Sequence, residues 1–376
     1  MSRILLSSIL LVSISVGCDM AVVPGGGGGQ GGTSSQITEA RIITSGNLKK
    51  DISTSLRGIA TFRLEDFPSD QTQSPEIPEL VLPGMFLDGS PSCLNTGDDR
   101  ARYGINSAGE LLALGFLTGS CDSQDSYFVN VYADATRLNG EQQPVRIASL
   151  EGPRDRFDNA LEIAIDRERD LLYVSSDPPP GVAGPERIYV FDNISQPSFD
   201  DVVSPVRTII LPGPILAAIR FRITTMAMGT DDTLYVQRGV DVHRITNAST
   251  RDGTFTDADI ETMSFGENPD VSPVKHFTLD SQNRLWLILS TGRIMRINDD
   301  FTDTDLDVSI SLPPTESSNT DYFLQIDSQG IAYVYGSEIL SIYPNIESGS
   351  ADVETMPTGG TFMVDVEKST PFILVE

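Results

Sequence analysis

Short runs in which apolar and polar residues alternate recur along most of the chain. An alternation of period two predicts half-buried β-strands, and no stretch shows the 3.6-residue period of an amphipathic helix. Six related phrases each place two such runs around a tight turn: "YGINSAGELLAL", "LEIAIDRERDLLYV", "MAMGTDDTLYV", "FTLDSQNRLWLI", "LQIDSQGIAYV" and "FMVDVEKSTPFILV". Asp or Asn opens most of these turns, where its side chain can bond the backbone ahead of it. The pattern therefore predicts an all-β chain of repeated hairpins.

Each hairpin is followed by a third apolar-polar strand and, after a polar loop, by a fourth. Third strands include "RIYVFDN" and "GRIMRIN", and fourth strands include "VRTIILPG" and "DVSISLP". Four antiparallel strands that recur every 40 to 60 residues or so are typical of a β-propeller blade. Five complete blades are expected near residues 103–152, 161–213, 223–267, 276–313 and 323–360.

The two ends of the repeat region predict one further blade. The chain ends after two strands, within residues 361–376, and residues 57–84 supply two strands that belong to no complete unit. Together they would form a composite blade that closes the ring with strands from both termini, which removes exposed sheet edges. Residues 37–376 are thus predicted to form a six-bladed β-propeller of four-stranded antiparallel blades.

The phrase "LQIDSQGIAYV" resembles the repeat of six-bladed propellers of the NHL and SMP-30/gluconolactonase type. The resemblance covers the chain from about residue 57 to 376 and implies the fold. Enzymes of the SMP-30 type hold a divalent metal at the channel through acidic and amide side chains. Candidate counterparts at the channel mouth are Asp158, Asn159, Asn319 and Asp321, without a residue-by-residue match to that family's motif.

The N-terminus predicts a lipid anchor. Residues 1–17 have an early Arg3 and an apolar run that is too short to span a bilayer, as in a secretory signal peptide. The ending "SVGC" resembles a bacterial lipoprotein cleavage box, which implies lipid attachment to Cys18, although Ser15 stands where that box prefers Leu. Residues 18–36 continue as a Gly-rich tether. We expect a lipid-anchored protein of the bacterial cell envelope, on the periplasmic or the cell-surface side.

The two other cysteines predict a disulfide. Cys93 and Cys121 form an even pair in a compartment that oxidises thiols. In the predicted propeller their loops emerge at the same mouth of the first blade.

The charge excludes two classes of partner. The chain carries 53 acidic against 26 basic residues, a net charge of −27 spread along its length. Nucleic acids and anionic lipid surfaces both need a basic face, so membrane contact is expected only through the anchor. We expect a monomer.

The residues available for catalysis are few. The chain has two histidines, and no GxSxG, HExxH or phosphate-binding Gly loop within the predicted propeller. His276 begins a first strand, from which it could face the channel, whereas His243 lies on a third strand away from it. "DDFTDTDLD" spaces acids as calcium loops do, which makes calcium the one cation candidate. No other cofactor is predicted.

These observations predict an envelope lipoprotein whose propeller is a binding module. Its ligand would be a protein, a small molecule or a glycan, held at the loop-rich mouth of the channel. The alternative function is a metal-dependent hydrolase, similar to a lactonase, with its site at the channel. A third possibility is a structural scaffold.

Overall fold

The computed structural model describes most of the repeat region and parts of the two ends. The described residues are 41–51, 54–63, 79–83, 102–116, 127–135, 141–142, 144–153, 162–176, 184–213, 223–266, 274–310, 322–336, 339–349, 360–363, 366–367 and 373–375. Within them the regular structure is almost entirely strand, with short 3-10 turns at Ala248–Thr250, Asp257–Asp259 and Ile346–Ser348. No helix in the described part is long and apolar enough to cross a membrane.

Five of the sheets in this part of the chain are each built from four antiparallel strands that follow one another in sequence. Blade 1 holds β4 (Arg102–Ile105), β5 (Leu111–Phe116), β6 (Tyr127–Tyr132) and β8 (Arg146–Leu150). Blade 2 holds β9 (Ile163–Asp166), β10 (Leu171–Ser176), β11 (Arg187–Asp192) and β13 (Arg207–Ile210). Blade 3 holds β14 (Ile223–Met228), β15 (Thr233–Arg238), β16 (Asp241–Thr246) and β18 (Glu261–Ser264). Blade 4 holds β19 (Val274–Leu279), β20 (Leu285–Leu289), β21 (Arg293–Ile297) and β22 (Thr304–Ser309), and blade 5 holds β23 (Phe323–Ile326), β24 (Ala332–Gly336), β25 (Ile339–Tyr343) and β26 (Gly360–Met363).

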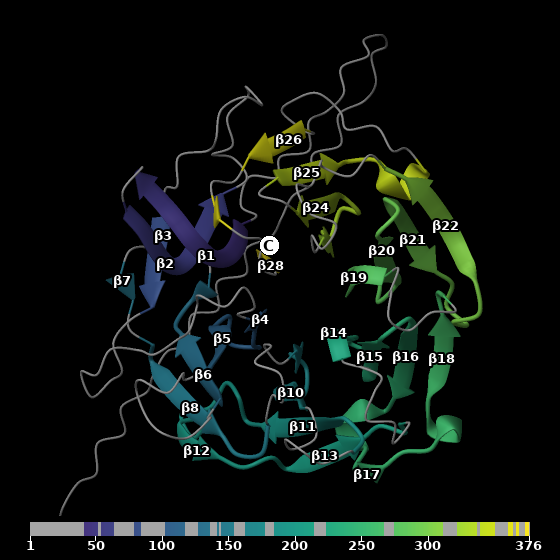
Figure 1. Ribbon diagram of the computed structural model, residues 1–376. Coiled ribbons are helices and arrows are strands. Elements are labelled where there is room, and N and C mark those ends of the chain that lie inside the picture. The colour runs from purple at the N-terminus through teal and green to yellow at the C-terminus, as the bar shows by residue number, and fades with distance from the viewer. Residues whose placement is uncertain are drawn as a thin grey trace, which may run out of the picture. The chain divides into compact units, whose positions relative to one another are not determined.

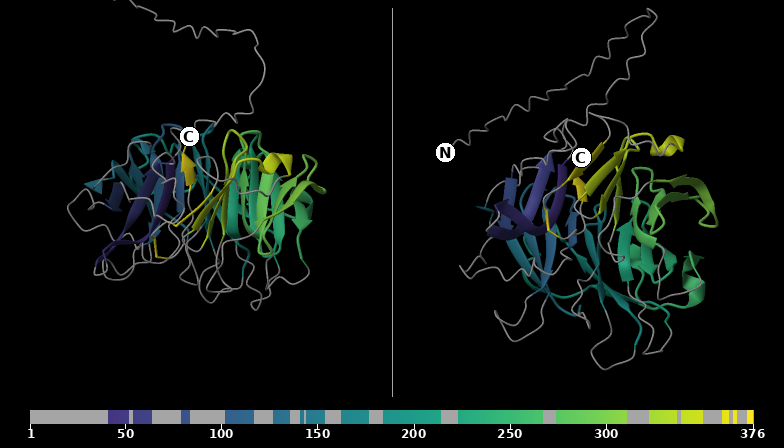
Figure 2. Two further views of the ribbon diagram at one scale, coloured as in Figure 1. Left: turned by 90° about the horizontal axis from the view of Figure 1, so that it is seen from above. Right: turned by 45° about the horizontal axis from the view of Figure 1, so that its top comes forward.

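The blades follow one another around a common centre. The first strand of each blade contacts the first strand of the next, in the order β4, β9, β14, β19 and β23. These innermost strands surround the centre of the ring, and the fourth strands lie at its rim (Figure 1). Seen from the side, the strands of neighbouring sheets run next to each other across the thickness of the ring (Figure 2). The predicted β-propeller with four-stranded antiparallel blades is confirmed.

The hydrophobic core lies between the blades, and the period-two alternation of the strands places it there. On β20, Trp286 and Ile288 pack against blade 5, while Leu285 and Leu287 face blade 3. A strand with both faces covered reads as a continuous apolar run, as "LWLIL" does. Since each blade is apolar on two faces, its neighbours are needed to bury it, which is why the sequence repeats.

The aspartates that open the first-to-second strand turns stabilise these turns by accepting backbone hydrogen bonds with their carboxylates, as predicted. Asp280 accepts hydrogen bonds from the backbone N–H groups of Gln282 and Arg284, both at 2.9 Å. Its second oxygen accepts from the indole Nε1 of Trp286 at 2.8 Å. Asp327 in blade 5 repeats this arrangement, with the Tyr333 hydroxyl in place of the indole. A carboxylate that satisfies several donors at once explains why Asp occupies this position.

A sixth sheet contains strands from both ends of the chain, but not those that the sequence predicted. Its order is β27 (Val366–Glu367), β1 (Arg41–Asp51), β2 (Thr54–Arg63) and β3 (Glu79–Pro83), with β28 (Ile373–Val375) also paired to β1. The segment Gly360–Met363, which was expected to begin the composite blade, instead pairs with β25 as the last strand of blade 5. The predicted blade of residues 361–376 and 57–84 is therefore wrong, because β1 was not recognised as a strand and takes the place next to β2. The strand pairing therefore does not support a six-bladed ring that is closed by two strands from each terminus.

Short connections fasten each blade to the one before it. Between the third and fourth strands, β7 (Glu141–Gln142) pairs in parallel with β3, β12 (Asp201–Val203) with β8, and β17 (Gly253–Thr254) with β13. The same connections insert buried side chains into the core of the preceding interface, among them Ile194, Phe199, Ala248, Phe255, Phe301 and Ile346. Neighbouring blades are therefore joined at the rim as well as through their faces.

Candidate functional site

The antiparallel order of the strands gives the ring two different mouths. The first-to-second strand turns, with Asn106, Asp166, Asp280 and Asp327, lie at one end, which we call the turn mouth. The connections from each fourth strand to the next first strand, and from each second strand to the third, lie at the opposite end, which we call the loop mouth. The longer connections were the predicted binding surface, and most of their residues lie outside the described part of the chain.

The structure places only one of the predicted site residues. His276 lies on β19, one of the innermost strands, near the loop mouth. Asp158, Asn159, Asn319 and Asp321 lie outside the described residues, as do the predicted lipidation site Cys18 and the predicted disulfide pair Cys93 and Cys121.

His276 is held as a neutral hydrogen-bond acceptor. Its Nδ1 accepts the backbone N–H of Leu324 at 3.3 Å, which ties blade 4 to blade 5. The ring meets the edge of the Phe323 ring with the centroids 5.3 Å apart. Burial lowers the pKa of His276 to about 3, and the positive charge of Arg102 contributes to this shift. Near neutral pH the imidazole is thus uncharged, with its proton on Nε2.

Arg102, at the start of β4, ties blade 1 to blade 2. Its Nε donates to Glu162 Oε2 at 2.7 Å, and its Nη2 donates to the other carboxylate oxygen. The backbone N–H of Glu162 donates in turn to the Ser175 hydroxyl at 2.8 Å. Both charged side chains are largely buried, with 14% and 9% of their side-chain surface exposed. The two parallel hydrogen bonds give this pair a fixed geometry.

Two further side chains make equivalent connections at the loop mouth. Arg238, at the end of β15, forms a buried ion pair with Glu186, which precedes β11, and so joins blade 3 to blade 2. Its Nη1 also donates to the carbonyl of Pro212. Gln237 donates through Nε2 to the carbonyl of Val274 at 2.8 Å and joins blade 3 to blade 4.

At the loop mouth, then, a side chain crosses each of the four junctions between blades 1 and 5. Sequence reasoning singled out only His276 among these residues. A signal for the others was present, because a charged residue such as Glu162 in the apolar phrase "LEIAID" is costly to bury without a partner. The partner could not be inferred, since Arg102 is 60 residues away in the chain.

The candidate calcium segment lies at the rim and not at the channel. Asp305 and Asp307 lie on β22, and their carboxylates accept hydrogen bonds from Arg296 and Arg293 of the adjacent strand. Across the described ranges, no group of three or more His, Cys, Asp or Glu side chains is arranged to hold a metal ion.

Comparisons with known proteins give fold-level likeness alone. No family model matches the chain, and no curated protein matches it in sequence. Among solved structures, apo AztD from Citrobacter koseri is 10% identical with a TM-score of 0.41, over 89% of this chain and 98% of that one. A protein of unknown function from Bacteroides caccae is 8% identical with a TM-score of 0.46, over 90% of this chain and all of that one. The β-propeller domain of Cps50 (Swd1) from Myceliophteria thermophila is 10% identical with a TM-score of 0.39, over 71% of this chain and 72% of that one. At such identities the description of the fold rests on the strand pairing given above.

Proposed function

We propose that the protein is a lipid-anchored component of the bacterial cell envelope whose propeller binds a partner or small ligand at the loop mouth. The observation that carries the proposal is the set of polar side chains that cross every junction between blades 1 and 5 at that mouth. They make a rigid base for the connections that emerge above them. A binding surface gains affinity and selectivity when its supporting elements are ordered before the ligand arrives.

The state of His276 favours binding over acid–base chemistry. A general base needs a pKa near the working pH, whereas the pKa of His276 is lowered to about 3. Its Nδ1 is also occupied by the Leu324 N–H group. The imidazole is therefore suited to donate one hydrogen bond from Nε2, not to accept a proton.

The position of Cys18 between a signal-like segment and a Gly-rich tether supports the lipid anchor. A flexible tether of about 19 residues would hold the propeller away from the membrane while leaving it free to turn. Cys18→Ala should move the protein from the membrane to the soluble fraction of the envelope without changing its circular dichroism. A mutant that stays in the membrane fraction with unchanged mass would exclude lipidation at this residue.

We further propose that the sheet of β1, β2 and β3 acts as a sixth blade. The parallel pairing of β7 with β3 supports this, because β12 and β17 fasten true blades to their predecessors in the same way. Removing Ile373–Glu376 would take away β28, the partner of residues 41–43 on β1. The truncated protein should lose its cooperative unfolding transition or aggregate, since an unpaired strand edge is exposed. Melting like that of the intact protein would contradict the proposal.

A disulfide between Cys93 and Cys121 would restrain the loop mouth at blade 1. It is expected to add about 3 kcal/mol to the free energy of unfolding by restricting the unfolded chain. Thiol titration of the denatured, unreduced mature protein should find no free thiol on either residue. Two reactive thiols would exclude the bond.

The binding role itself can be tested by site-specific photo-crosslinking in living cells. A photoreactive amino acid at Asp158 would report on the loop mouth, and the same amino acid at Gln282 would report on the turn mouth. We expect a discrete crosslinked product, or protection of the probe by an added ligand, at Asp158 alone. Equal crosslinking at the two positions, or none at Asp158, would contradict a binding surface at the loop mouth.

A further inference from the structure

The fourth strands of blades 1 and 2 each receive an extra parallel strand from the next blade, and both additions begin in the same way. In blade 1, the Asp200 carboxylate accepts the backbone N–H of Ile147 at 3.0 Å, and β12 then pairs along β8. In blade 2, the Asp252 carboxylate accepts the N–H of Thr208 at 2.9 Å, and β17 then pairs along β13. An Asp therefore starts each added strand by bonding to the edge of the fourth strand.

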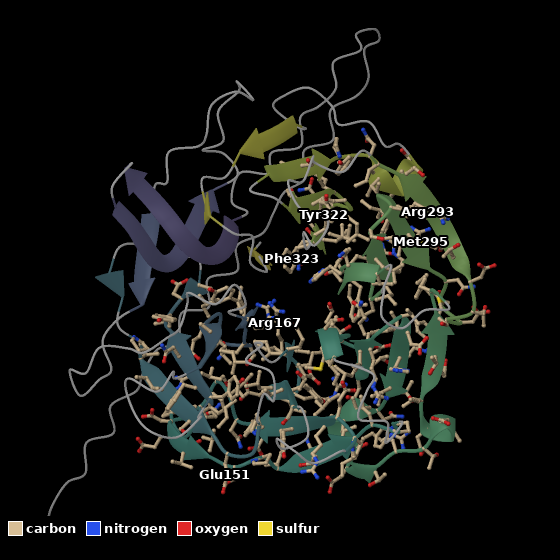
Figure 3. All side chains as sticks on the ribbon, viewed as in Figure 1. Glu151, Arg167, Arg293, Met295, Tyr322 and Phe323 are labelled. Atoms are coloured by element: carbon tan, nitrogen blue, oxygen red, sulfur yellow. The ribbon has the colours of Figure 1, made fainter. Side chains whose placement is uncertain are left out.

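The residues after the Asp complete the added strand. Asp201 and Gly253, which come next, have φ values of 52° and 86°, in the left-handed region. At the outer rim of blade 1, the carbonyl of Val203 accepts the N–H of Glu151 at 2.9 Å (Figure 3). Val203 packs against the core between blades 1 and 2, and Phe255 is buried between blades 2 and 3. The shared pattern is an Asp, a left-handed residue and, three places after the Asp, an apolar side chain that reaches the core.

Blade 3 has no such addition within the described residues. Its sheet ends at β18, although the connection of blade 4 that corresponds to β12 and β17, residues 298–303, is described throughout. Arg244 Nη1 holds this connection by donating to the carbonyl of Asp299 at 2.8 Å, and Phe301 is buried in the core between blades 3 and 4. The connection therefore reaches blade 3 through side chains and leaves the edge of β18 unpaired.

The outer edge of β18 offers backbone groups at two uncharged residues. The N–H of Phe265 donates to the carbonyl of Val240, just before β16. Because antiparallel pairs alternate, Met263 also bonds toward β16, while the backbone groups of Thr262 and Ser264 point away from the sheet. Met263 and Phe265 are half-buried apolar side chains at this edge. Lys, Pro or a bulge commonly protects an open edge, and β18 has none of them.

Thr262 occupies the position in blade 3 that Thr208 has in blade 2. Thr208 pairs with Tyr189, the third residue of β11, and Thr262 pairs with His243, the third residue of β16. The N–H of Thr208 is the group that the Asp252 carboxylate accepts. The edge of β18 therefore presents the same starting point for an added strand as the edge of β13.

We propose that the edge of β18 binds an extended segment of a partner protein, which adds to blade 3 as a parallel strand and begins with Asp followed by Gly or Asn. Its Asp would accept the N–H of Thr262, and the apolar residue three places later would lie beside Phe265. Main-chain hydrogen bonds supply the affinity of such strand addition, and side chains at fixed places supply the selectivity. A second copy of this chain is a poorer occupant, because each copy carries a net charge of −27. This surface lies at the rim and is separate from the loop mouth (Figure 1).

The chain supplies both the probe and the reporter for a test. The peptide acetyl-RDGTFT-amide, a copy of residues 251–256, contains the Asp, the Gly and the apolar residue of the pattern. His243 Nδ1 lies 2.9 Å from Thr262 Oγ1, so its imidazole NMR signals report on this edge, and His276, the other histidine, is an internal reference at the loop mouth. Added to the full-length protein, the peptide should shift the His243 signals in a saturable way and leave His276 unchanged. It should also slow hydrogen exchange at the amides of Thr262 and Ser264.

Matched changes separate strand addition from other effects. Replacing the Asp of the peptide by Ala removes the acceptor for the Thr262 N–H and should weaken binding about tenfold. Ser264→Pro removes an outward N–H without taking a hydrogen bond from the pairing of β16 with β18, so it should weaken binding by a similar factor while the thermal melt stays close to that of the wild type.

Equal binding of the two peptides would overturn the proposal, as would unchanged His243 signals and unchanged exchange of β18 at millimolar peptide. Shifts of His243 that follow protein concentration without any peptide would show that a second copy occupies the edge, and would overturn the assignment to a partner protein. Crosslinking at Asp158 tests the loop mouth independently of these results.

Discussion

Removing the carboxylate of Asp280 should strongly destabilise the interface between blades 4 and 5. This carboxylate is almost fully buried and accepts four hydrogen bonds. Two come from the backbone N–H groups of Gln282 and Arg284, one from the Arg284 Nε at 2.6 Å, and one from the Trp286 indole at 2.8 Å. The first strand, the turn and the second strand of blade 4 thus share one acceptor.

The size of the effect follows from the donors that Asp280→Ala leaves behind. Trp286 is fully buried, so its indole N–H loses its only partner at a cost of about 1–3 kcal/mol. The two backbone donors are less buried and add about 0.5–1.5 kcal/mol each, for a total of about 2–6 kcal/mol. In a chain of this size that corresponds to a melting temperature lower by roughly 3–8 °C. Asp280→Asn should lose less, because its carbonyl can still cap the turn while its amide faces the indole N–H.

Trp286 also supplies the assay, because it is the only tryptophan in the chain. Its fluorescence during urea unfolding reports on the affected interface, and circular dichroism recorded in parallel tests for a single transition. Asp299→Ala is a matched control, since this Asp is exposed and its carboxylate accepts no hydrogen bond from the residues that the structure describes; its effect should stay within about 0.5 kcal/mol. If Asp280→Ala costs less than about 1 kcal/mol, the carboxylate does not organise the turn and the reasoning fails.

Three further outcomes are expected. Stability should fall as the pH drops from about 6.5 toward 4, because burial lowers the pKa of His243 to about 4 and the unfolded chain takes up the proton first. The part due to His243 reaches about 3 kcal/mol at most, and His276, whose pKa burial lowers to about 3, adds to the loss over the same range; His243→Gln should therefore make this part of the pH profile measured by urea unfolding less steep. Gly152→Ala should cost about 1–3 kcal/mol, because Gly152 has φ +108° and a Cβ there would lie 2.9 Å from the Tyr189 ring. Gly253→Ala, with φ +86° and open space around it, should cost less in the same thermal melts. Ile346→Ala should cost about 2–5 kcal/mol, since this fully buried side chain joins the core between blades 4 and 5; an effect like that of a surface mutation would mean that the connection does not fasten the blades.

The sequence by itself determined the repeated four-stranded blade. Strand alternation and turn chemistry are local properties: Asp280 and Trp286 are six residues apart, and their hydrogen bond is made within one hairpin. The same is true of Asp327 and Tyr333 in blade 5. Because each blade repeats the same strand alternation and the same type of turn, comparing the phrases with one another was enough to predict the propeller.

The tertiary structure decided which segments meet at a distance. The ion pair of Arg102 with Glu162 spans 60 residues, and the bond between Leu324 and His276 spans 48, so no periodicity in the chain indicates either partner. The pairing of β28 with β1 joins the two ends of the chain. The 11-residue strand β1 was not predicted, because its sequence "RIITSGNLKKD" is largely polar and shows no clear alternation of apolar and polar residues. Such contacts depend on the packing of neighbouring blades, which brings side chains from different blades to one mouth. The sequence pattern predicts how each blade folds. The pairs of side chains that meet across a junction are decided only when neighbouring blades pack.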